Sequence, residues 1–95
     1  MELYVIRRRS NWDSAEDLET TAAKSSAEGE KMSDEVRWIR SYVVQEEDGK
    51  LGTVCIYESV SPEAIRRHAG NTGMSADEIT KVADTVIVRE DPVAV

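Results

Sequence analysis

The order in which strand-forming and helix-forming segments alternate is the strongest constraint on how this chain folds. Four segments rich in Val, Ile, Leu, Tyr and Trp predict strands, and two segments between them carry helix-start signals. The predicted strands are 2–9, 36–45, 51–57 and 79–89, and the predicted helices are 15–28 and 62–69. The order β-α-β-β-α-β is typical of the ferredoxin-like motif. We therefore expect an α+β fold, a four-stranded antiparallel sheet with both helices on one face.

Local signals mark the ends of both helices. Ser61 is a helix N-cap, and Pro62 after it fits the first helical position. Asp13 and Ser14 are both candidate caps for the first helix, and Gly29 is a candidate stop at its end. These signals support the two helices independently of the strand pattern.

Length and charge limit the classes of function. The 95 residues correspond to one domain, expected at 1–91 with a tail at 92–95. The formal net charge of −7 argues against a nucleic-acid-binding surface. Between residues 13 and 35, eight acids against two lysines give −6, which is typical of a solvated helix face. An interaction module whose acidic helix docks a basic partner is one functional alternative.

Cysteine content and hydropathy indicate the compartment. Cys55 is the only cysteine and has no intrachain disulfide partner, which favours a reducing environment. The apolar run 3–6 is too short for a signal peptide, and no segment approaches the roughly 20 apolar residues of a membrane span. The chain is expected to be cytoplasmic, with no membrane partner.

The predicted hairpin assigns side chains to the two sheet faces. With Asp48 and Gly49 as a two-residue turn, Tyr42 lies opposite Cys55. The residues then expected beneath the helices are Ile39, Ser41, Val43, Val54 and Ile56.

The opposite, open face is predicted to be aromatic and basic, with Arg40 opposite Tyr57. It would hold Trp38, Arg40, Tyr42, Cys55 and Tyr57, in a row that Val44 and Thr53 extend. A bare antiparallel face normally carries solvated residues, so we expect this one to be covered. A second subunit would make a homodimer through the open face. Alternatively, the face lines a small-molecule pocket in which Arg40 binds a carboxylate. Both can hold at once.

Metal-binding and nucleophilic motifs are sparse. His68 is the only histidine, so a metal site needs oxygen ligands from Glu58, Glu63, Asp84, water or a second subunit. Its structural alternative is a histidine beside an apolar helix stripe. Cys55 has no CxxC partner and no serine lies in a nucleophile elbow, so no catalytic residue is proposed.

Three arginines end the first predicted strand, Arg7, Arg8 and Arg9. Alternate residues of a strand point to opposite faces, so at most two act together. Pairing with the acidic first helix is the simpler account of them.

Three strings carry a family resemblance. They are VRWIRSYV at 36–43, CIYE at 55–58 and SPEAIR at 61–66. Together they resemble a family of small bacterial nickel-binding-protein-like chains, also described as a domain of unknown function. The resemblance implies a ferredoxin-like fold, a homodimer and binding of Ni²⁺ or another divalent transition metal. It does not place the ligands, and His68 and Glu58 are the candidates that the residues themselves offer.

The leading hypothesis is a small cytoplasmic homodimer of this family that binds a divalent transition metal. Imidazole with oxygen ligands suits Ni²⁺ among several metals. One alternative is a cofactor-free enzyme that resembles dimeric α+β barrel monooxygenases and isomerases, with a small-molecule pocket on the open face. The other is the acidic interaction module. The balance favours a role without catalysis.

Overall fold

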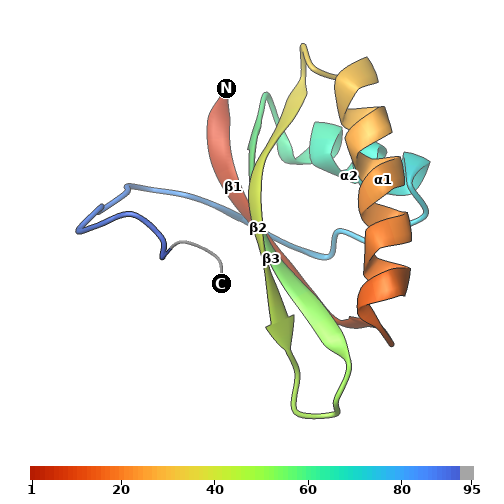
Figure 1. Ribbon diagram of the computed structural model, residues 1–95. Coiled ribbons are helices and arrows are strands. Elements are labelled where there is room, and N and C mark those ends of the chain that lie inside the picture. Colours follow the sequence, from red (N-terminus) through yellow and green to blue (C-terminus); the bar gives the residue numbers. More distant parts are fainter. Residues whose placement is uncertain (93–95) are drawn as a thin grey trace.

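The computed structural model describes residues 1–92 and contains one sheet with two helices on one face (Figure 1). The elements are β1 (Glu2–Trp12), α1 (Ala15–Lys31), β2 (Val36–Gln45), β3 (Leu51–Ser59), α2 (Pro62–Asn71) and β4 (Glu78–Lys81). The strand order is β2-β3-β1-β4, and every neighbouring pair is antiparallel. The ferredoxin-like α+β prediction is confirmed. No helix in residues 1–92 is long and apolar enough to cross a membrane. Residues 93–95 of the predicted tail lie outside the described part.

Both helices begin at the predicted serine caps. The Oγ atom of each serine accepts a hydrogen bond from the backbone N–H three residues later in the chain. The distance is 3.2 Å both from Asp17 to Ser14 and from Ala64 to Ser61. α1 continues past the predicted stop at Gly29 as far as Lys31. Met32, just beyond the helix, packs against the hydrophobic core. Tertiary packing therefore outweighs the local stop signal.

The hydrophobic core lies between the sheet and α2. Ile6 of β1 and Val36 of β2 are fully buried against Ala64 and Ile65 of α2. In contrast, the only buried residue of α1 is Ser25. α1 therefore covers the sheet without filling all the space beneath it.

The β2–β3 hairpin has a three-residue loop, which reverses the predicted assignment of faces for β3, whereas Ser41 and Val43 of β2 lie on the helix side as predicted. The N–H of Glu46 donates to the carbonyl of Lys50 at 2.9 Å, and Gly49 completes the turn with a φ of +86°. Compared with a two-residue loop, a three-residue loop shifts the pairing of the strands by one residue. Because successive side chains of a strand point to opposite faces, this shift moves the side chains of β3 to the other face of the sheet. The predicted pairing of Tyr42 with Cys55 is therefore wrong.

A β-bulge shifts the register a second time. It lies between Trp38 and Arg40 and places Trp38 opposite Tyr57, so the predicted pairing of Arg40 with Tyr57 is also wrong. Trp38, Thr53, Cys55 and Tyr57, all predicted on the open face, instead face the helices. Arg40 and Tyr42 remain on the open face.

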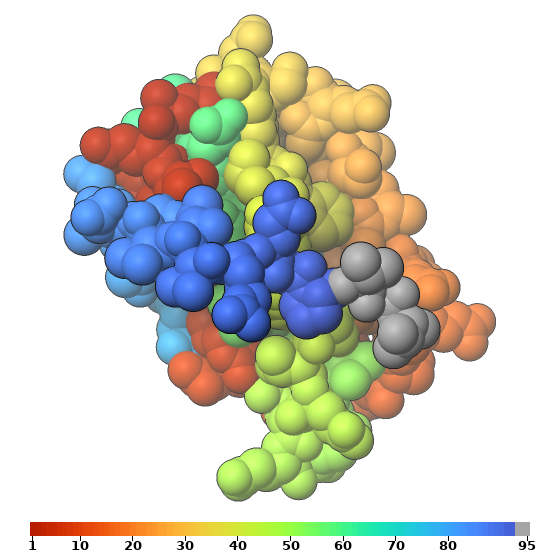
Figure 2. All heavy atoms as spheres, turned by 60° about the vertical axis from the view of Figure 1, so that its left-hand side comes forward, coloured from red at the N-terminus to blue at the C-terminus, as the bar shows by residue number. Residues whose placement is uncertain are grey.

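The last strand ends well before the predicted limit of 79–89. After β4, the N–H of Val82 adds one bond to the carbonyl of Leu3 at 2.9 Å. Because β4 and β1 are antiparallel, later residues would need partners before Leu3, and β1 begins at Glu2. Residues 83–92 therefore leave the sheet and run across its open face (Figure 2).

Candidate functional site

A cavity of about 440 Å³ lies between α1 and the sheet. Trp12 and Trp38 form much of its apolar wall, and Leu18 and Ala22 come from α1. The cavity exists because α1 presents small side chains, such as Ala22 and Ser25, toward large aromatic residues on the strands. Its volume lies within the range of small-molecule sites.

Hydrogen bonds fix the aromatic walls of this pocket. The rings of Trp38 and Tyr57 stack with centroids 6.2 Å apart and an interplanar angle of 11°. The Tyr57 hydroxyl lies 3.3 Å from Ser25 Oγ, and burial raises the pKa of Tyr57, so the phenol is neutral near pH 7. Trp12 Nε1 donates to Thr21 Oγ1 at 3.0 Å. The walls are therefore ordered before any ligand enters.

Two buried polar groups on the sheet side of the pocket come from β1 and β3. Arg8 is only 4% exposed, and its Nε donates to the carbonyl of Ser75 at 2.9 Å. Its Nη1 lies 3.7 Å from Cys55 Sγ. Thr53 pairs with Arg8 across the two strands, and its buried Oγ1 has no hydrogen-bond partner within residues 1–92. Two buried polar groups thus lie side by side in a largely apolar cavity.

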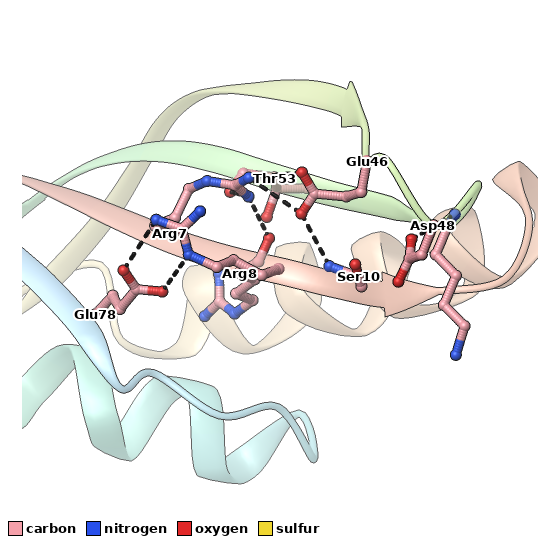
Figure 3. Close-up of polar contacts among 9 residues, drawn as sticks. Arg7, Arg8, Ser10, Glu46, Asp48, Thr53 and Glu78 are labelled. Atoms are coloured by element: carbon pink, nitrogen blue, oxygen red, sulfur yellow. Dashed lines mark hydrogen bonds and ion pairs between the residues drawn. The ribbon is translucent and has the colours of Figure 1, made fainter.

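The three consecutive arginines have different partners. Arg7 makes bonds of 2.7 and 3.0 Å to Glu46 of the β2–β3 loop, and Arg9 lies 2.8 Å from Glu78 of β4. The predicted pairing of these arginines with the acidic first helix is therefore wrong. Arg7 and Arg8 leave β1 in opposite directions (Figure 3). Within the described chain, no carboxylate lies within 4.0 Å of the Arg8 guanidinium.

The predicted pocket residues are divided between the two faces. Trp38, Cys55 and Tyr57 line the cavity, but on the helix side of the sheet. Arg40 contributes to the cavity edge, and Tyr42 does not line it. The prediction of a pocket on the open face is therefore wrong in location, because the odd loop and the bulge change which side chains point toward the helices.

Arg40 and Tyr42 hold the C-terminal segment across the open face instead. The Tyr42 hydroxyl donates to Asp91 Oδ2 at 2.6 Å, and Arg40 Nη1 donates to the same oxygen at 3.0 Å. The bond to Tyr42 and the charge of Asp91 raise the pKa of Arg40. The positive charge of Arg40 is thus paired with Asp91 of the same chain, so Arg40 is not free to bind an external anion.

Sequence reasoning missed Arg8 and Trp12. The available signal was the alternation of β1, in which Arg8 follows Tyr4 and Ile6 at a spacing of two and so shares their buried face. The lack of a counter-ion at Arg8 has no local signature, because it depends on which side chains meet in the folded chain.

The two predicted metal ligands lie on opposite sides of the sheet. His68 is 1% exposed, and its ring lies edge-on to Tyr57 with centroids 5.7 Å apart. Its Nε2 lies 2.9 Å from the carbonyl of Ser25 and carries the proton, since a carbonyl oxygen only accepts. Glu58 pairs with Arg37 at 3.1 Å on the open face. Across residues 1–92, no three His, Cys, Asp or Glu side chains are placed to hold a metal ion. One chain therefore does not fit a His68–Glu58 metal centre.

Comparisons with known proteins identify the family. A family model described as nickel responsive protein SCO4226-like matches residues 4–82. The crystal structure of SCO4226 from Streptomyces coelicolor A3(2) is similar with a TM-score of 0.71 and 20% identity, covering 88% of this chain and 99% of that chain. At this identity the likeness shows the fold alone. No curated protein gives a significant match. Because the family model spans most of the sequence, the chain belongs to the nickel-responsive SCO4226-like family.

Proposed function

We propose that this protein binds a small organic molecule in the pocket between α1 and the sheet. The observation that carries the proposal is the cavity of about 440 Å³ with aromatic walls. A helix that serves only as a cover normally fills such space with large apolar side chains. α1 presents Ala22 and Ser25 there, opposite Trp38 and Tyr57.

A cavity-filling variant tests this proposal. Ala22→Leu on the pocket wall should block the site, whereas Ala23→Leu on the exposed side of α1 is the matched control. The probe is naphthylacetamide, a neutral aromatic compound, followed by amide NMR shifts. We expect saturable shifts at pocket residues in the parent and in Ala23→Leu, and loss of these shifts in Ala22→Leu. Equal binding by both variants would show that the compound binds elsewhere.

A divalent transition metal is the second candidate ligand, and the family description supports it. Within one chain, the buried His68 and the ion-paired Glu58 do not fit the role of its ligands. Because residues 1–92 hold no group of three such ligands either, we propose that a nickel site would draw its ligands from two copies of the chain. Calorimetric titration with Ni²⁺ on tag-free protein tests this candidate, and the absence of binding heat would remove it.

We also propose that two copies of the chain associate through the open sheet face. Val54 and Ile56, predicted beneath the helices, instead lie half-buried on the open face. The side chains of the segment Val86-Ile87-Val88 beside this face are 78–86% exposed. A run of exposed apolar side chains is typical of a surface that binds another protein chain. A second copy supplies a matching apolar face by symmetry.

Sedimentation velocity tests this association. Ile87→Asp should convert a dimer to a monomer, because its side chain is 78% exposed and the fold of one chain does not depend on it. Ala23→Asp places the same charge on the outer side of α1 and should leave the dimer intact. A parent chain that sediments as a monomer would refute the proposal.

The buried free thiol of Cys55 supports a reducing compartment, and we place the protein in the cytoplasm.

A further inference from the structure

We propose that the ligand of the pocket is an organic carboxylate, held by the Arg8 guanidinium with the Thr53 hydroxyl as a second donor. This inference rests on the proposed function and names the chemical class of its ligand. Arg8 and Thr53 are neighbours across β1 and β3, and both side chains line the cavity.

The charge of Arg8 is the first argument. A guanidinium has five N–H donors, and the hydrogen bonds of Arg8 go to the Ser75 carbonyl through Nε and to the Cys55 sulfur through Nη1. A backbone carbonyl and a thiol are both uncharged groups, so neither partner supplies a negative charge to Arg8. A buried cation without a counter-ion is unfavourable, so an anion that enters the pocket gains a large part of its affinity there.

The two neighbouring arginines of β1 differ from Arg8 in the partners that they bind. Arg7 and Arg9 each bind a carboxylate, Glu46 and Glu78, with two hydrogen bonds. Arg8 alone of the three points toward the cavity, where residues 1–92 supply no carboxylate within 4.0 Å of it. An arginine fork matches a carboxylate with two parallel bonds, and Arg8 still has donors for them.

Thr53 is the second, independent observation. Its side chain is 3% exposed, and Oγ1 is buried without a partner in residues 1–92. Buried hydroxyls are nearly always hydrogen-bonded, so an orphan on a cavity wall indicates a missing acceptor. A carboxylate oxygen beside Arg8 is such an acceptor.

The walls limit the rest of the ligand. Trp12, Trp38 and Tyr57 form its aromatic walls, and the polar atom of each is hydrogen-bonded to a side chain of the same protein. Glu19 is the one carboxylate of the described lining, and it is exposed at the α1 side. The cavity therefore suits an aromatic or aliphatic body with its carboxylate directed toward the sheet.

The experiment compares two probes of the same shape, naphthylacetate and naphthylacetamide, by amide NMR titration. The parent protein should bind the carboxylate about tenfold or more tightly than the amide, as expected for charge-assisted bonds. Arg8→Gln should remove this preference while it retains amide binding. Arg9→Gln, which removes the same charge from an exposed site, should keep the preference.

The outcomes separate this inference from the proposed function. If naphthylacetamide binds in the pocket as tightly as naphthylacetate, the proposal of a carboxylate ligand is overturned but the pocket itself stands. No binding of either probe at the pocket would overturn both proposals. The comparison of the two probes on the parent protein needs no substitution, so the test stands if Arg8→Gln fails to fold.

Discussion

Thr53→Val should make the protein more stable, although it removes a polar group. Thr53 is 3% exposed, and its Oγ1 has lost water without gaining a partner within the described residues. An unsatisfied buried polar group costs about 1–3 kcal/mol, and valine has nearly the same shape and a high strand propensity. Because the hydroxyl borders a cavity, we take the lower end and expect a gain of about 1 kcal/mol.

Urea unfolding measures this gain. With a slope of about 1 kcal/mol per M for a small domain, the midpoint should rise by about 1 M. Thr21→Val is the matched control with the opposite sign, because Thr21 Oγ1 accepts the Trp12 indole N–H at 3.0 Å. That variant should lose about 1 kcal/mol. A Thr53→Val protein with an unchanged or lower midpoint would refute the reasoning, since the hydroxyl would then have a stabilising partner.

Three further predictions concern other contacts. His68→Ala should lower the free energy of unfolding by about 3 kcal/mol in urea titrations, because it empties a buried site and removes the bond to the Ser25 carbonyl; unchanged stability would contradict a structural role. The hydrogen bond from Arg67 lowers the pKa of Glu35, so its stabilisation is present above about pH 4.5 and is lost as the pH falls through the folded-state pKa. Glu35→Gln should therefore flatten the acid-side decline in stability measured by thermal melts as the pH falls below about 4.5, and an equally steep decline would argue against this pair. Asp91→Asn should leave global stability within about 0.5 kcal/mol but increase the amide mobility of residues 83–92 in NMR relaxation, because its partners are exposed; unchanged mobility would mean that other contacts hold the segment.

The element order and the helix starts could be predicted from the sequence, because their causes are local. A serine cap and a proline at the first helical position act within one turn of the chain, and strand-forming runs differ plainly from the segments between them. The alternation of Tyr4, Ile6 and Arg8 also shows locally which face of β1 is buried.

The faces of the hairpin were predicted wrongly for a reason that is equally physical. Between β2 and β3, loops of two and of three residues are both compatible with Asp48-Gly49, yet they place Cys55 and Tyr57 on opposite faces. Burial decides between them, because the loop that forms directs the Tyr57 ring into the core beside His68.

The sequence by itself determined an α+β domain with a ferredoxin-like order of elements and two well-marked helices. Only the tertiary structure decided where β4 ends, because that depends on where β1 runs out of partners. It also decided that α1 lies over large aromatic residues with small ones of its own, which leaves a cavity. The isolation of Arg8 follows from the same packing, since Glu46 and Glu78, which the fold brings to this end of β1, pair with Arg7 and Arg9.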